Sequence, residues 1–183
     1  MTSPTHGCGK SIVAANLALS LARRPSGKTV LLDMELRAPQ LAYWFGMPDA
    51  GALRDFLDGK KSLQDHFRRI GETLVLGLNN QAESKAAEIL QEPSTAQALS
   101  TMMTTLKPEI VVMDAPPALV SDDVVALAHL VDAVLLIADG TRSSPRDIRA
   151  CEKLFDNNLP VLGVVLNRAQ DRSLSRYRYA RKR

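Results

Sequence analysis

Short apolar runs rich in Val, Ile and Leu recur along the chain. They cover residues 29–33, 74–78, 110–114, 133–138 and 161–167. Because none of them alternates polar and apolar positions, they predict strands buried on both faces, as in a parallel sheet covered by helices. Helical patterns lie between the runs, at residues 11–24, 53–57, 84–90, 95–106, 122–130 and 144–157. The alternation predicts an α/β fold with a doubly wound, mostly parallel sheet flanked by helices.

The composition is that of an ordinary globular domain. The chain has 183 residues, of which 45% are hydrophobic, 23% charged and 4% aromatic, so we expect one domain with an aliphatic core. The most apolar stretch, residues 124–138, contains His129 and Asp132 and is too short to span a bilayer. The amino-terminal residues lack the pattern of a secretory signal, which predicts a cytoplasmic protein. Cys8 and Cys151 form neither a disulfide framework nor a zinc pattern.

The net charge of +3 is unevenly distributed. Residues 168–183 contain seven Lys or Arg and one Asp, a balance of +6, which leaves −3 on residues 1–167. We therefore expect a main domain over residues 1–167 and a basic tail over 168–183. Such a tail indicates a solvated end or an anionic partner.

A phosphate-binding loop is predicted just before the first helix. The segment GCGKS at residues 7–11 combines glycines, which let the backbone approach phosphate oxygens, with a lysine for the β/γ-phosphates and a serine hydroxyl for magnesium. Pro4 stands where the full phosphate-loop pattern has its first glycine, so a chance turn is an alternative. The candidate nucleotide-binding residues here are His6, Gly7, Cys8, Gly9, Lys10 and Ser11.

Acidic residues end two of the predicted strands. Asp33 closes one apolar run and is followed by Glu35, and Asp114 closes another, as a magnesium-orienting Walker B aspartate does. Ligands of open parallel sheets bind at the carboxyl ends of the strands. The coincidence of these acids with the loop predicts nucleotide binding, with a solvated turn as the alternative for Asp33.

The order of four segments resembles a known family. SPTHGCGKS, LLDMELRAP, VVMDAPP and VLGVVLN occur in the order found in the bacterial tyrosine kinases, or BY-kinases, of capsule and exopolysaccharide synthesis. These kinases belong with the Min- and Par-type ATPases to the deviant group of P-loop NTPases. The resemblance covers nearly the whole chain and implies the P-loop NTPase fold with ATP and Mg²⁺ as cofactors.

The resemblance also implies roles for single residues. Lys10 and Ser11 would hold the phosphates and magnesium. Asp33 would act on the incoming tyrosine hydroxyl or on metal-bound water, while Glu35 and Asp114 would support the metal. The implied catalytic residues are Lys10, Asp33 and Glu35, and the implied metal residues are Ser11, Asp33 and Asp114. Asn167 would face the adenine, or is alternatively a turn residue that ends its strand.

Several positions depart from the family pattern. Glu35 stands where the family usually has Asp, and Cys8 occupies a position that is often Glu. Thr5 takes the place of the signature lysine of Min- and Par-type loops, which argues against those relatives. Of the family's tyrosine cluster only Tyr177 and Tyr179 occur, and they are either autophosphorylation sites or solvated residues. We interpret the aromatic residues 43–45 as a packed corner.

The first strand of the expected sheet is missing from the pattern. A phosphate-binding loop normally follows a buried strand, and here only Met1 and Thr2 precede Ser3. Either the chain is a fragment or has a misassigned start, or a shortened protein folds with a gap in its sheet. Because a gap exposes unpaired backbone and apolar helix faces, we expect low stability and weak or absent kinase activity.

The leading functional hypothesis is an ATP-dependent protein-tyrosine autokinase that regulates exopolysaccharide or capsule chain length and export. The resemblance implies a membrane-embedded polysaccharide co-polymerase as activating partner, a homo-oligomer, and a cytoplasmic location at the inner face of the membrane through that partner. No nucleic-acid partner is expected. The alternatives are an ATP-binding regulator without kinase activity and a Par- or Min-type positioning ATPase whose basic tail contacts DNA or anionic lipid.

Overall fold

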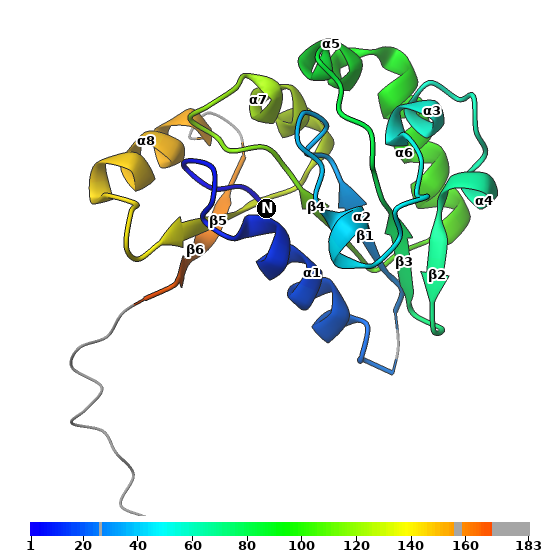
Figure 1. Cartoon of the computed structure of the whole chain (residues 1–183), viewed down its shortest axis with the longest axis horizontal. Coiled ribbons are helices and arrows are strands. Elements are labelled where there is room, and N and C mark those ends of the chain that lie inside the picture. The colour runs from blue at the N-terminus through cyan, green and yellow to red at the C-terminus, as the bar shows by residue number, and fades with distance from the viewer. Residues whose placement is uncertain (26, 156–158, 170–183) are drawn as a thin grey trace, which may run out of the picture.

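Strands and helices alternate along most of the chain in the computed structural model, which describes residues 1–25, 27–155 and 159–169 (Figure 1). The strands are β1 (Thr29–Asp33), β2 (Arg68–Ile70), β3 (Leu74–Gly77), β4 (Ile110–Asp114), β5 (Val134–Asp139) and β6 (Val161–Asn167). The helices are α1 (Lys10–Leu21), α2 (Leu41–Trp44), α3 (Leu53–Leu57), α4 (Leu63–His66), α5 (Ala86–Gln91), α6 (Pro93–Leu106), α7 (Asp123–Leu127), the 3-10 helix η1 (Ala128–Leu130) and α8 (Pro145–Phe155).

The strands form two pieces of sheet. One has the order β2-β3-β1-β4 and is parallel except for β2, and the other pairs β5 with β6 in parallel. Met1 and Thr2 lie between the pieces: Met1 is hydrogen-bonded to β4 and to Ala115 just after it, and Thr2 is hydrogen-bonded to β5. Among the described residues no strand fills the space between β4 and β5, as predicted, and Met1 and Thr2 bridge this gap at the carboxyl end of β4.

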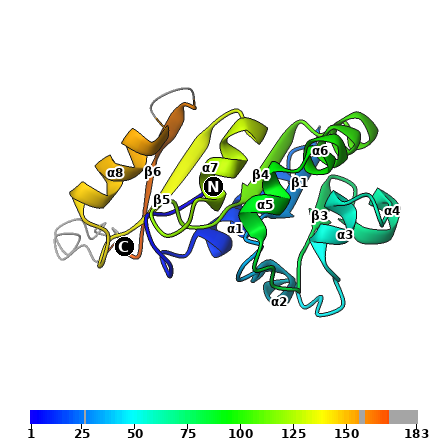
Figure 2. The same ribbon diagram turned by 90° about the horizontal axis from the view of Figure 1, so that it is seen from above.

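The larger piece of sheet is covered on both faces. Val30 and Leu32 of β1 point into a cluster with α3, α5, α6 and α7. Leu31 points the other way, against α1 and α2. Figure 2 shows α5, α6 and α7 on the side of the sheet opposite α2. All five residues of β1 are buried, because helices cover both faces of the sheet. This explains the uninterrupted apolar run of β1, as expected for a doubly wound sheet.

All the predicted strands are present, with ends that differ by at most one residue. Strand β6 is not buried on both faces as predicted, because Leu162 is 73% and Leu166 59% exposed. This strand pairs only with β5 among the described residues and lies at the end of the sheet, so its apolar run is not covered on both faces. The short elements β2, α2 and α4 were not predicted. Of these three, α4 could have been predicted from its sequence, because Ser62 and Asp65 form a capping box at its start.

The interpretation of residues 43–45 as a packed corner is wrong for two of the three. Tyr43 is 80% and Trp44 52% exposed, and their rings contact each other edge to face. Helix α2 buries Leu41 and Ala42 instead, which leaves the aromatic side chains on its outer face.

A buried histidine predicts acid sensitivity of the fold. His66 stacks on Phe56, and its Nε2 lies 2.8 Å from the carbonyl oxygen of Leu78. Burial, with Lys61 and Arg68 nearby, lowers the pKa of His66 below its ordinary value. Below about pH 6.5 the unfolded chain therefore binds a proton more readily than the folded chain does, so the free energy of unfolding falls as the pH falls.

The change His66→Gln keeps a donor near Leu78 and removes the titration. In urea unfolding at about pH 7.5 and about pH 5.5, we expect the parent chain to lose more stability on acidification than the variant. Equal losses would contradict this role of His66. His129→Gln is the matched control, because His129 lies on η1, outside this cluster.

Candidate nucleotide-binding site

The phosphate-binding loop lies against the carboxyl ends of the strands. Gly7 and Gly9 have φ angles of 81° and 86°, in the left-handed region that favours glycine. Gly9 is the N-cap of α1, and because it has no side chain, the first-turn N–H groups of α1 receive no acceptor from the cap. Free N–H groups and the positive end of a helix dipole form an anion site. The loop therefore has the backbone geometry of a phosphate site.

Two residues at the end of the last apolar run, Asn167 and Arg168, hold the loop in place by hydrogen bonds. The Asn167 amide donates to the Cys8 carbonyl oxygen at 2.8 Å, and the Arg168 guanidinium donates to the Gly7 carbonyl oxygen at 2.7 Å. Arg168 also pairs with Asp139, the buried last residue of β5, at 3.1 Å. The predicted residue Asn167 therefore reaches the loop, whereas Arg168 and Asp139 were not predicted. Asp139 carries the same signal as Asp33 and Asp114, an acid that ends an apolar run.

Lys10 connects the loop to the acids of the sheet. Its ammonium nitrogen lies 3.3 Å from Glu35 Oε2 and 3.4 Å from Asp114 Oδ1, and all three residues are buried. Asp33 and Asp114 are neighbours in the register of β1 and β4. The sheet therefore brings Lys10, Asp33, Glu35 and Asp114 together, while their catalytic and metal-binding roles stay predictions.

Asp33 is fully buried, and its charge is only partly compensated. One carboxylate oxygen accepts from the Leu41 N–H at 3.1 Å, while Oδ1 has no partner among the described residues. Burial, together with the nearby Asp114, raises the pKa of Asp33 to about 8. The side chain therefore keeps its proton at neutral pH until a cation approaches or the surroundings change.

The donor set suits magnesium in combination with a nucleotide. In the described part of the chain no three His, Cys, Asp or Glu side chains are grouped to hold a metal ion by themselves. Mg²⁺, however, is usually bound by one or two carboxylates together with substrate phosphates and water. Oδ1 of Asp33 and Oδ2 of Asp114 are buried oxygens without partners among residues 1–25, 27–155 and 159–169, and Ser11 stands in the first turn of α1. Such hard oxygen ligands fit the ion.

An ion pair holds the loop after β1 in place. Arg37 donates from Nε and Nη2 to the two carboxylate oxygens of Asp123 at 2.6 and 3.0 Å, and from Nη1 to the Ser84 carbonyl oxygen. Asp123 is buried at the start of α7. The pair spans the segment that carries Glu35 and was not predicted, although Arg37 belongs to the motif LLDMELRAP.

The structure leaves His6 outside the cluster around Lys10, and two further predicted residues are not among those that it describes. His6 is exposed on the loop. Tyr177 and Tyr179 lie outside the described residues. The described start of the basic tail, Arg168, packs against the phosphate loop, so the boundary at residue 167 stays a prediction.

Comparison with known proteins agrees with this geometry. The family model described as "ParA: NUBPL iron-transfer P-loop NTPase" matches residues 1–173. The putative tyrosine-protein kinase EpsB of Ralstonia solanacearum is 35% identical over 185 residues, covering 98% of this chain and 24% of that protein. The putative tyrosine-protein kinase CapB of Staphylococcus aureus is 27% identical and covers 98% of this chain and 78% of that protein.

A solved structure gives the same result. The kinase domain of VpsO superimposes with a TM-score of 0.84 at 31% sequence identity, over 92% of this chain and 83% of that chain. This chain spans about a quarter of the length of EpsB, so the match concerns one part of that protein. The shared fold, the loop and the acids at the strand ends place this chain in the ParA family of P-loop NTPases, among the bacterial tyrosine-kinase domains.

Proposed function

We propose that the chain is a protein-tyrosine kinase domain that uses Mg-ATP, phosphorylates tyrosines on other copies of itself, and regulates exopolysaccharide or capsule chain length and export. The observation that carries this proposal is the buried cluster of Lys10, Asp33, Glu35 and Asp114 beside a phosphate-binding loop. The similarity to the EpsB and VpsO kinases supports it.

The cluster has the groups that phosphoryl transfer needs. The loop N–H groups and Lys10 would hold the phosphates, and Ser11, Asp33 and Asp114 would hold magnesium, which neutralises phosphate charge when bound. Asp33 would take the proton of the tyrosine hydroxyl while the new bond from oxygen to the γ-phosphorus forms and the bond to ADP breaks. Burial keeps a proton on Asp33 at neutral pH, with a pKa of about 8, and magnesium bound beside it would release that proton, so that the carboxylate could act as a general base.

The partner and the acceptor tyrosines belong to the same proposal. In the described residues no helix is long and apolar enough to cross a membrane. We propose that a membrane-embedded polysaccharide co-polymerase activates the domain and holds it at the inner face of the membrane, and that the domain forms homo-oligomers. Tyr177 and Tyr179 are the proposed acceptors, since an Arg directly precedes each of them in a basic segment of the sequence.

The direct test is phosphotyrosine formation. The purified chain is incubated with Mg-ATP, alone and with a synthetic tyrosine peptide, and probed with an antibody to phosphotyrosine. We expect a signal, weak because of the gap in the sheet, that EDTA removes and that the double change Tyr177→Phe with Tyr179→Phe removes from the chain but not from the peptide. The matched control is Tyr43→Phe, an exposed tyrosine on α2.

Two outcomes would contradict the kinase proposal. Tight Mg-ATP binding without phosphotyrosine on chain or peptide would favour the alternative, a nucleotide-binding regulator without kinase activity. The observation that favours this alternative is Glu35, which stands where the family usually has Asp. Salt-sensitive DNA binding stimulated by ATP would favour a positioning ATPase.

A further inference from the structure

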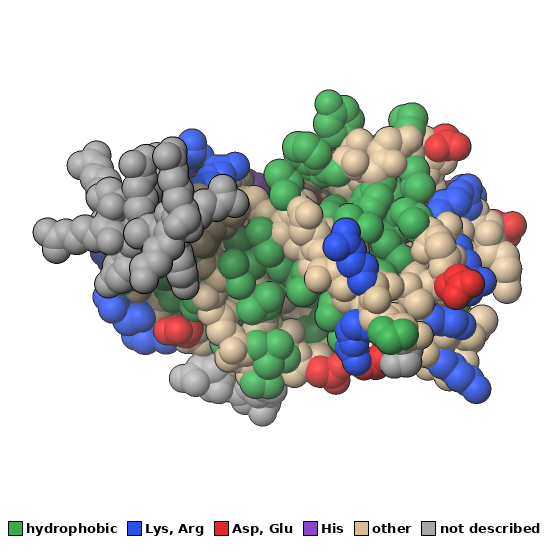
Figure 3. Space-filling model, turned by 90° about the horizontal axis from the view of Figure 1, so that it is seen from below, with side chains coloured by type: hydrophobic (Ala, Val, Ile, Leu, Met, Phe, Trp, Pro, Cys, Tyr) green, Lys and Arg blue, Asp and Glu red, His purple; other side chains and the backbone are tan. Residues whose placement is uncertain are grey.

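A small pocket lies at the end of the sheet where β1 and β3 begin, between β2 and the last turn of α6. Its volume is about 150 Å³, and the charged residues that line it are Lys28, Arg68 and Arg69. Leu106 of α6 and Leu63 of α4 contribute apolar walls. Figure 3 shows Lys and Arg side chains gathered on the side of the molecule where β2 lies. We call this opening the basic pocket.

The three cations are held by backbone carbonyl groups and not by carboxylates. Lys28 Nζ donates to the Leu106 carbonyl oxygen at 3.2 Å, and Arg69 Nη2 donates to the Glu72 carbonyl oxygen at 2.8 Å. Arg68 likewise donates to backbone carbonyl oxygens. None of the three forms an ion pair with a residue that the structure describes. Carbonyl acceptors fix the position of a cation but leave its charge uncompensated, and each guanidinium keeps further N–H donors for an anion.

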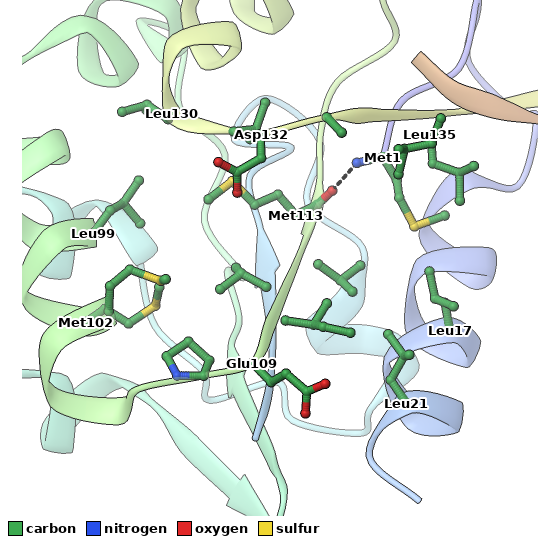
Figure 4. Close-up of a pocket in the computed structure, with 18 residues that line it drawn as sticks. Met1, Leu17, Leu21, Leu99, Met102, Glu109, Met113, Leu130, Asp132 and Leu135 are labelled. Carbon is green, nitrogen blue, oxygen red and sulfur yellow. Dashed lines mark hydrogen bonds between the residues drawn. The ribbon is translucent and has the colours of Figure 1, made fainter. Parts of the chain in front are cut away.

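The acidic residues Asp65 and Glu109 are engaged outside the basic pocket. The Asp65 carboxylate accepts from Ser62, and Glu109 pairs with Arg24 at 2.6 Å. Glu109 and Asp132 line the neighbouring apolar cleft between β4 and β5 (Figure 4). Within the described part of the chain, the charged side chains of the basic pocket are therefore all cations, and those of the apolar cleft are all acids.

The size and the donors of the basic pocket fit one phosphate group. A volume of about 150 Å³ corresponds to about five water molecules of about 30 Å³ each. Pockets for drug-sized ligands are larger, at about 300–1,000 Å³. Arginine presents a planar fork of donors that matches phosphate oxygens, and lysine binds phosphate as a point charge. The lining therefore favours a small anion with several acceptor oxygens.

The basic pocket is separate from the nucleotide site. Lys28 directly precedes β1, and Asp33 of the nucleotide site is the last residue of the same strand. Five steps of about 3.3 Å along an extended chain place these two residues about 16 Å apart. A nucleotide bound at the carboxyl ends of the strands therefore leaves the basic pocket open.

We propose that the basic pocket binds a phosphate group, either inorganic phosphate or the phosphate of an anionic lipid head group, through Lys28, Arg68 and Arg69. The two sources share one chemistry, a phosphate anion whose oxygens accept from cationic donors. The proposal is independent of kinase activity, because it concerns the opposite end of the sheet.

The first arm of the test titrates the chain with inorganic phosphate and follows its backbone amides by NMR. Mg-ADP is present in excess, so that the phosphate-binding loop is occupied. We expect the amides of β2 to shift, and the double change Lys28→Gln with Arg69→Gln to weaken binding about tenfold or more. The matched control, Lys85→Gln with Arg149→Gln, removes two exposed cations from other surfaces and should bind phosphate as the parent does.

The second arm separates the two sources of phosphate. The three chains are sedimented with vesicles of phosphatidylcholine alone and with vesicles of phosphatidylcholine and phosphatidylglycerol in equal parts. Because all three carry the same basic tail, its contribution to sedimentation is equal. If a lipid head group is the ligand, the parent and the control sediment with the mixed vesicles more than the double variant does. If the ligand is free phosphate, the three chains sediment alike while phosphate still shifts β2.

Three results would overturn the proposal. The first is the absence of phosphate binding together with equal sedimentation of the three chains, which would leave Arg68 and Arg69 as charges that protect an edge strand. The second is phosphate binding that shifts no amide of β2. The third is an equal loss of binding in the double variant and in the control, which would reflect net charge alone. If circular dichroism shows that the double variant is unfolded, Arg69→Gln alone replaces it, since Arg69 is exposed.

Discussion

Replacing Lys10 by Met is expected to weaken binding of Mg-ADP about 100-fold, measured by isothermal titration calorimetry. Lys10 is the cation that lies between the phosphate loop and the carboxylates of Glu35 and Asp114. A charge-assisted hydrogen bond contributes about 1.5–3 kcal/mol, and each 1.4 kcal/mol corresponds to about tenfold in affinity. In the variant the carboxylates of Glu35 and Asp114 have lost their cation and repel the phosphates. We therefore expect a loss near the upper end of the range of about 1.5–3 kcal/mol.

The control for this experiment must separate binding from folding. Removing one partner of a buried ion pair costs about 3–5 kcal/mol of stability, so circular dichroism must show that the variant is folded. Lys10→Arg keeps the charge and provides a second folded variant, while Lys85→Met removes a lysine whose side chain is 69% exposed. A dissociation constant within about threefold of the parent value for Lys10→Met would mean that Lys10 does not contact the phosphates.

The sequence was most informative where local pattern and topology coincide. The uninterrupted apolar runs of β1 and β4 end at Asp33 and Asp114, and their parallel pairing places the two acids side by side. Because the carboxyl ends of parallel strands share one edge, a pattern read along the chain predicts an arrangement in space. The glycines of the phosphate loop also allowed its backbone conformation to be predicted, since Gly7 and Gly9 adopt backbone angles that other residues avoid.

The remaining features depend on contacts between distant parts of the chain. Arg168 and Gly7 are 161 positions apart, and Arg37 and Asp123 are 86 apart, so no local period connects them. The exposure of Tyr43 was also unpredictable, because aromatic residues occur on surfaces as well as in cores. Helices as short as α2 and α4 are formed by tertiary packing rather than by their own propensity.

Asn in place of Asp33 should leave the fold intact. At neutral pH the raised pKa, about 8, means that the carboxyl is largely protonated before nucleotide binds, and an amide has nearly the shape of that neutral form. Its oxygen can still accept from the Leu41 N–H. We therefore expect unfolding in urea at about pH 7 to be as cooperative for Asp33→Asn as for the parent chain.

Phosphate transfer to tyrosine, in contrast, should fall by about 10²–10⁴-fold in Asp33→Asn, because an amide cannot take the proton of the hydroxyl. The measurement is single-turnover formation of phosphotyrosine from Mg-ATP, with calorimetry of Mg-ADP on the same samples. Asp49→Asn is the matched control, since Asp49 is exposed beyond α2. A rate close to the parent rate would assign the proton to another group, whereas a loss of Mg-ADP binding equal to the loss of rate would make Asp33 a residue for binding alone.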